Sequence, residues 1–97
     1  MTYKTAIRIL MEIFIRNGYV RIKNESKLKA NGSKSYKKGY EIRFLPKEDI
    51  ELERLQTAIS TLNFYVSKTF MKRGRVVQPL YGKDITLEFR DLQTNPD

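Results

Sequence analysis

The chain has 97 residues, 40% of them hydrophobic, and carries 19 Lys and Arg against 11 Asp and Glu, which gives a formal net charge of +8 at pH 7. It contains neither cysteine nor histidine, so disulfides, thiolate metal sites, the commonest general base and the commonest transition-metal ligand are all excluded. This composition disfavours an enzyme and predicts a polyanionic partner.

The segment from Lys4 to Lys23 contains the most apolar stretch of the chain. Charged residues at a spacing of four predict one polar seam along a helix. The rest of the helix carries two apolar stripes, although packing against the chain's own sheet requires only one. The seam comprises Lys4, Arg8, Glu12 and Arg16; one stripe comprises Ala6, Ile9, Leu10 and Ile13, and the other Ile7, Met11, Phe14 and Ile15.

The surplus stripe predicts a homodimer interface formed by Ile7, Met11 and Phe14, unless the helix is buried centrally within one chain. Asn17 and Gly18 are expected to end the helix, since both tolerate a left-handed C-cap. The charges within residues 1–16 argue against a signal peptide and a membrane span, and the absence of cysteine suits a cytoplasmic location.

Two alternating segments, at residues 19–23 and 39–45, predict strands. Between them, residues 24–38 are rich in Lys, Ser and Asn and contain the turn signal Asn31-Gly32. This segment is either a long hairpin closed by that turn or a flexible loop that orders on a ligand, and the sequence does not decide between them.

A second helix is predicted from the acidic residues Glu48, Asp49 and Glu51, followed by a core stripe of leucine and isoleucine that ends near Asn63. Arg73-Gly74 predicts a turn before a third strand at 75–81, in which Pro79 requires an edge position or a bulge. The alternation of apolar and polar residues at 85–90 predicts a fourth strand. The apolar positions are Ile85, Leu87 and Phe89, and the outward positions are Thr86, Glu88 and Arg90.

The predicted fold is therefore α+β, with the order helix-strand-strand-helix-strand-strand and a four-stranded antiparallel sheet that packs two helices on one face. One domain is expected over residues 1–92, with a frayed tail at 93–97. The other sheet face is expected to be polar and exposed.

Residues 10–18, LMEIFIRNG, resemble the signature helix of the LAGLIDADG homing endonucleases in the leading leucine and the closing glycine. The order of elements also resembles one half-unit of that family, with its final helix missing or cut short. The resemblance implies paired signature helices and sheets lying in the DNA major groove. The acidic positions of that motif are occupied by Asn17 and Ile15, so the resemblance implies a relative that does not cleave DNA.

Basic residues concentrate in two segments, one of which also carries tyrosines suited to stacking on bases. These residues predict a non-catalytic nucleic-acid-binding protein without a cofactor or metal, with DNA favoured over RNA; the competing interpretation is a solvated hairpin kept soluble by its lysines. The candidate contacts are Arg21, Lys23, Lys27, Lys29, Lys34, Tyr36, Lys37, Lys38, Arg43, Lys72, Arg73, Arg75 and Arg90, with Lys68 and Tyr40 nearby.

Arg21, Arg43 and Arg90 are the candidates for contacts to bases, because a guanidinium can bond two guanine acceptors. They could equally pair across strands with Glu41 or Glu88. One alternative function is a protein-interaction module. A less favoured alternative is a metal-dependent nuclease in which Glu41 and Glu88 hold magnesium.

Overall fold

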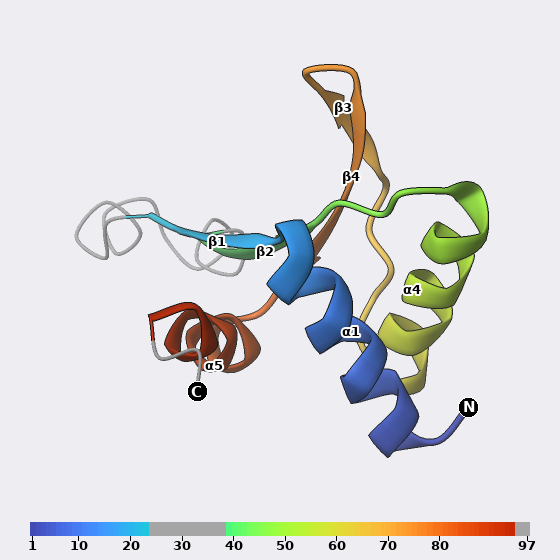
Figure 1. Cartoon of the computed structure of the whole chain (residues 1–97). Helices are drawn as coiled ribbons and strands as arrows, with labels where there is room; N and C mark the ends of the chain where they lie inside the picture. The colour runs from blue at the N-terminus through green and yellow to red at the C-terminus, as the bar shows by residue number, and fades with distance from the viewer. Residues whose placement is uncertain (24–38, 95–97) are drawn as a thin grey trace. The chain divides into compact units, whose positions relative to one another are not determined.

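The computed structural model in Figure 1 describes residues 1–23 and 39–94. Within these residues the strands form one antiparallel sheet in the order β1-β2-β4-β3. The predicted α+β class and the order helix-strand-strand-helix-strand-strand are confirmed. The elements are α1 (Tyr3–Asn17), β1 (Tyr19–Ile22), β2 (Tyr40–Phe44), α4 (Asp49–Thr61), β3 (Phe70–Lys72), β4 (Arg75–Tyr81) and α5 (Lys83–Thr94).

The C-terminal segment is a helix, so the prediction of a strand at residues 85–90 is wrong. Thr86 and Phe89 are buried three residues apart, and Ile85 and Leu92 are half-buried on the same side, which is the spacing of a helix. α5 is thus a third helix. The family resemblance had implied that the final helix is missing or cut short in this chain. α5 extends to Thr94, and residues 95–97 lie outside the described part of the chain.

By its internal contacts the chain divides into two compact units, which are described separately. Unit 1 comprises Met1–Gly18 and Arg43–Leu80, and unit 2 comprises Tyr19–Ile42 and Tyr81–Asp97. In unit 1, α1 runs beside α4 (Figure 1). The stripe Ala6, Ile9, Leu10 and Ile13 is buried, together with Leu55, Ala58 and Ile59 of α4.

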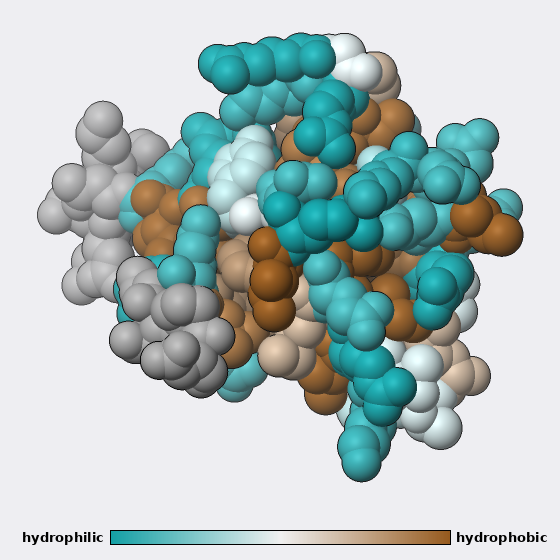
Figure 2. All heavy atoms as spheres, viewed as in Figure 1, coloured by the Kyte–Doolittle hydropathy of each residue, from teal (hydrophilic) through white to brown (hydrophobic). Residues whose placement is uncertain are grey.

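Phe14 belongs to the core and not to the exposed stripe in which it was placed from the sequence. Its side chain is only 3% exposed, and its ring meets that of Phe44 edge to face, with the centroids 6.3 Å apart. A different set of apolar side chains remains at the surface of α1, where Figure 2 shows hydrophobic atoms beside hydrophilic ones. This set, spaced by four residues, is Tyr3, Ile7, Met11 and Ile15.

The two ends of α1 are capped in different ways. At the N-terminus the Thr2 hydroxyl accepts a hydrogen bond of 3.1 Å from the Thr5 amide. At the C-terminus the Gly18 amide donates to the Phe14 carbonyl at 2.7 Å. Gly18 has a φ of −76°, so it does not adopt the left-handed conformation expected from the sequence. Glycine is required there because a Cβ would lie 2.6 Å from Phe14 Cδ1 and 2.7 Å from Phe14 Cα.

A buried glutamine fixes the connection that follows α4. Gln78 is 0% exposed, and its Nε2 donates to the Ser67 carbonyl at 2.8 Å. Its Oε1 accepts from Gln56 Nε2 at 2.9 Å. The neighbouring Pro79 lies beyond Val77, the last β4 residue paired with β3, so it occupies the edge-like position that the sequence required.

In unit 2, α5 packs against β1, and Phe89 is buried together with Tyr40 and Ile42 of β2. The Gly82 amide donates to the Tyr40 carbonyl at 3.1 Å, which fixes the start of α5. The Lys83 ammonium lies 5.8 Å from the centroid of the Tyr40 ring, within the range of a cation–π contact.

Candidate functional site

The turn between β3 and β4 has a backbone that is unusual for its sequence. Lys72 pairs with Arg75 in the β3–β4 register, so the connection consists of Arg73 and Gly74 alone. Both have a positive φ, 52° and 77°, which defines a type I′ turn. Gly74 meets this requirement freely, but for an arginine the left-handed conformation costs about 1–2 kcal/mol. The predicted Arg73-Gly74 turn is present, with a strained residue at its first position.

The same turn concentrates positive charge. Lys68, Lys72, Arg73 and Arg75 are all exposed, and the last three are adjacent at the end of the hairpin. No Asp or Glu occurs in the sequence between Glu53 and Asp84. Among the described residues, Arg73 and Arg75 form no ion pair. Lys72, Arg73 and Arg75 lie side by side at this turn, and Lys68 precedes β3; these four residues are called the hairpin cluster below.

The turn also borders a shallow depression of about 220 Å³ next to the first turn of α4. Glu48 and Asp49 line this depression together with Arg75, and Lys47 lines it as well. Arg73 does not line it. Of the two arginines at the turn, Arg73 is therefore the one that this depression does not bring near a carboxylate.

Arg43, predicted to lie on an exposed sheet face, is only 9% exposed. Its guanidinium lies over the Phe70 ring, 4.8 Å from the centroid, in a cation–π contact that sequence reasoning missed. All five residues of β2 are buried, so β2 contributes nothing to the exposed polar face that was expected. Arg43 therefore supports Phe70 at the base of the hairpin and is not placed to contact bases.

Arg21 and Lys23 are exposed on and just after β1 in unit 2. Arg21 Nη1 lies 3.9 Å from Glu41 Oε1, and the Glu41 side chain is buried, so the cross-strand pair considered from the sequence is present. Arg90 lies on α5, contrary to its predicted strand position, with its Nη2 3.4 Å from Asp91 Oδ1.

The remaining candidates belong to the predicted connection at residues 24–38 and lie outside the described residues. They are Lys27, Lys29, Lys34, Tyr36, Lys37 and Lys38.

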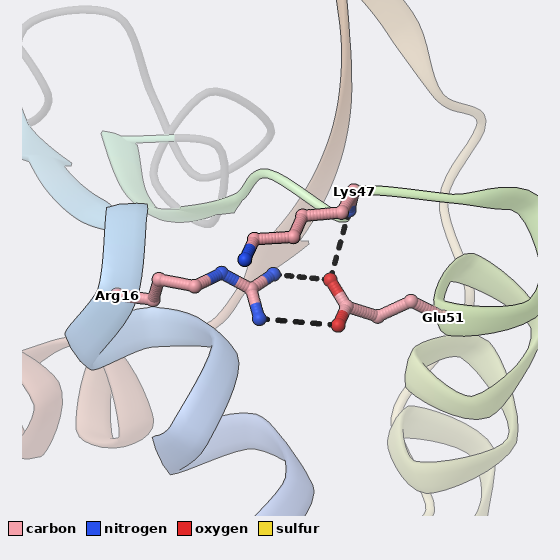
Figure 3. Close-up of polar contacts among 3 residues, drawn as sticks. All are labelled: Arg16, Lys47 and Glu51. Atoms are coloured by element: carbon pink, nitrogen blue, oxygen red, sulfur yellow. Dashed lines mark hydrogen bonds and ion pairs between the residues drawn. The ribbon is translucent and has the colours of Figure 1, made fainter.

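Figure 3 shows the best-formed ion pair of unit 1, which joins the last turn of α1 to the first turn of α4. The Arg16 guanidinium binds both carboxylate oxygens of Glu51, with Nη1 donating to Oε2 at 3.1 Å. The Lys47 amide also donates to Glu51 Oε1, at 2.8 Å. These hydrogen bonds, chiefly those from Arg16, hold the pKa of the Glu51 carboxyl below its usual value. The pair is structural, and no spacing rule in the sequence connected its two residues.

The metal hypothesis loses its geometric premise. Glu88 lies on α5 and not on a strand beside Glu41. In residues 1–23 and 39–94, no group of three Asp, Glu, His or Cys side chains could hold a metal ion. None of the helices in these ranges is long and apolar enough to cross a membrane.

Comparison with known proteins gives no relative on which to base a function. No family model, no curated protein and no solved structure matches the chain.

Proposed function

We propose that this protein binds nucleic acid, DNA in preference to RNA, through the phosphate backbone and without a catalytic step. The observation that carries this proposal is the hairpin cluster: four exposed cations in a stretch of sequence that has no carboxylate between Glu53 and Asp84. A surface of this kind neutralises phosphates and releases their counterions, which supplies most of the affinity of sequence-independent binding.

Arg21 and Lys23 of unit 2 and the cations predicted at residues 24–38 stay in the proposal as separate candidate contacts. Arg43 and Arg90 are left out, because the first is buried under its contact with Phe70 and the second lies on α5 beside Asp91. A cytoplasmic location and the absence of a cofactor belong to the same proposal. The resemblance to a LAGLIDADG half-unit supports it through the order of elements, to which α5 adds a final helix.

The test is a titration of duplex DNA, single-stranded DNA and RNA of one sequence at 50 and 200 mM salt. If all four cations of the hairpin cluster contact phosphates, the slope of log affinity against log salt on duplex DNA is about −3.6, which is roughly a hundredfold loss between the two concentrations. Absence of binding to all three nucleic acids at the lower salt concentration would refute the proposal.

A homodimer formed through α1 is the second part of the proposal. Ile7 is 45% exposed and Ile15 70% exposed, and Met11 lies between them on the same side of the helix. Burying such a side chain stabilises a complex by about 1.5–3 kcal/mol. This surface also favours a protein-interaction module as the alternative function, with a second copy of the chain as its partner.

Charge complementarity supports a second copy. Arg8 and Glu12 are exposed beside the apolar stripe, one helical turn apart. When two helices pack antiparallel about a two-fold axis, the same flank of each helix faces the other, so Arg8 meets Glu12 of the second copy twice. A helix of 15 residues is only about 22 Å long, so we expect a small interface and a dimer that dissociates at micromolar concentrations.

A further inference from the structure

The end of the β3–β4 hairpin combines two features that oppose its own stability. Lys72 and Arg75 are directly opposite in the antiparallel register, and like charges in that position repel each other. Between them, Arg73 has a φ of 52°, in a position of the type I′ turn that asparagine or glycine fills with less strain. A turn optimised for folding alone would have Asn-Gly at this place.

The strained conformation of Arg73 is not offset by an ion pair between Arg73 and any of the described residues. Gly74 has no heavy atom within 4 Å of the position that a Cβ would take, so the turn is open to solvent there. Glu48 and Asp49 line the depression together with Arg75, whereas Arg73 is not part of its lining. Residues that disfavour the local backbone conformation occur mostly at functional sites, where contacts with a ligand offset their cost in stability.

The side chains at the turn also indicate what kind of polyanion fits. Residues 71–76 contain no aromatic side chain, and Phe70 is covered by the Arg43 guanidinium. The turn therefore lacks the stacking platforms with which proteins hold single-stranded bases. Three cations without a platform suit a high density of phosphate, which a duplex presents at about one charge per 1.7 Å of its axis.

We infer that the β3–β4 turn is a binding site for the phosphodiester backbone of a nucleic-acid duplex, with Arg73 as its central contact. This inference rests on the proposed function and narrows it to one site and one form of nucleic acid. A duplex phosphate beside Arg73 relieves the repulsion between Lys72 and Arg75.

The decisive variant is Arg73→Asn, because it removes the charge and at the same time relieves the strained turn. We expect its Tm to rise by about 4 °C or more. We expect its affinity for duplex DNA to fall roughly three- to tenfold, and the salt slope to become shallower by about 0.9. Substitution of a residue with only a structural role would lower both the Tm and the affinity, whereas Arg73→Asn is expected to raise the Tm and lower the affinity.

Two variants serve as matched controls. Arg54→Gln removes one exposed cation from α4 and should leave duplex affinity within about twofold of wild type. Arg73→Lys keeps the charge and the backbone strain and should retain most of the binding. The probes are one sequence prepared as duplex DNA, duplex RNA and single-stranded DNA.

Failure of this inference is distinguishable from failure of the proposed function. If wild type binds no probe, the proposed function itself is refuted. If wild type binds duplex but Arg73→Asn binds equally well, or if Arg54→Gln is weakened as much as Arg73→Asn, the turn is not the site. A fall in the Tm of Arg73→Asn contradicts the argument from strain, and equal sensitivity of single-stranded binding to Arg73→Asn contradicts the assignment to a duplex.

Discussion

Replacement of Gly18 tests the packing at the end of α1. An alanine Cβ at this position lies 2.6 Å from Phe14 Cδ1, 2.7 Å from Phe14 Cα and 2.9 Å from the Phe14 carbonyl oxygen. Two of these atoms are backbone, and the ring is held against Phe44, so neither side yields easily. We expect Gly18→Ala to lower the free energy of unfolding by about 2–3 kcal/mol, the upper range for overpacking.

Asparagine separates this steric explanation from a conformational one. A glycine that serves as a left-handed cap can be replaced by asparagine with little loss. Gly74 meets this condition, since it has a φ of 77° and no neighbour within 4 Å of the Cβ position, so Gly74→Asn should cost less than about 0.5 kcal/mol. Gly18→Asn should be as harmful as Gly18→Ala, because its φ of −76° needs no special residue and the Cβ still collides.

Urea denaturation of these variants measures both free energies, and a loss of 2 kcal/mol also lowers the Tm by about 8–16 °C. If asparagine is tolerated equally well at both positions, the steric explanation from the contact with Phe14 is wrong, and Gly18 serves as a left-handed cap.

Three further predictions concern the ion pair, the buried glutamine and the exposed face of α1. Glu51→Gln should lower the free energy of unfolding by about 1 kcal/mol at pH 7. Because the pKa of Glu51 is depressed in the folded state, this difference in stability between wild type and variant is present above the ordinary pKa of 4.5 and vanishes as the pH falls through the folded pKa. Urea titrations across pH 2–7 can follow it. Gln78→Leu leaves the Ser67 carbonyl unsatisfied and should cost about 1–3 kcal/mol, with faster proteolysis of the connection at 62–69; unchanged stability would contradict the role given to this network. Ile15→Lys should leave a folded monomer in sedimentation experiments at high concentration, and a wild type that is itself monomeric there would refute the dimer.

The elements with a strong local pattern were predictable from the sequence. α1, β1, β2, α4 and β4 lie close to their predicted positions, because each pairs a clear hydrophobic period with a terminator such as Gly18 or Pro46. α5 was mistaken for a strand because Ile85, Leu87 and Phe89 alternate within residues 85–90, where Ile85 and Phe89 also have the i, i+4 spacing of a helix; Leu92, which extends that helical spacing, lies beyond this window. A window of six residues contains both periods and cannot separate them.

The candidate site divides in the same way between local and distant information. The hairpin cluster was predictable because its cations are adjacent in the sequence. The burial of Arg43 was not, since it depends on Phe70, a residue far along the chain that only the fold brings to 4.8 Å. The sequence also did not show that Tyr3 and not Phe14 lies at the surface of α1, because the burial of Phe14 depends on its contact with Phe44.

Pro79 affects how separate molecules interact. Because Lys72 and Arg75 flank a two-residue turn, they form a hydrogen-bonded pair, so the amides of Arg75 and Val77 point towards β3, as does the ring nitrogen of Pro79. β3 ends opposite Val77, and the part of β4 beyond it has an edge without a strand on that side. A strand from another molecule would find no donor at Pro79, and the pyrrolidine ring stands where it would have to pair. Gln78, Pro79 and Leu80 are also buried, so both the proline and its burial protect this length of β4 against the edge-to-edge addition that begins aggregation.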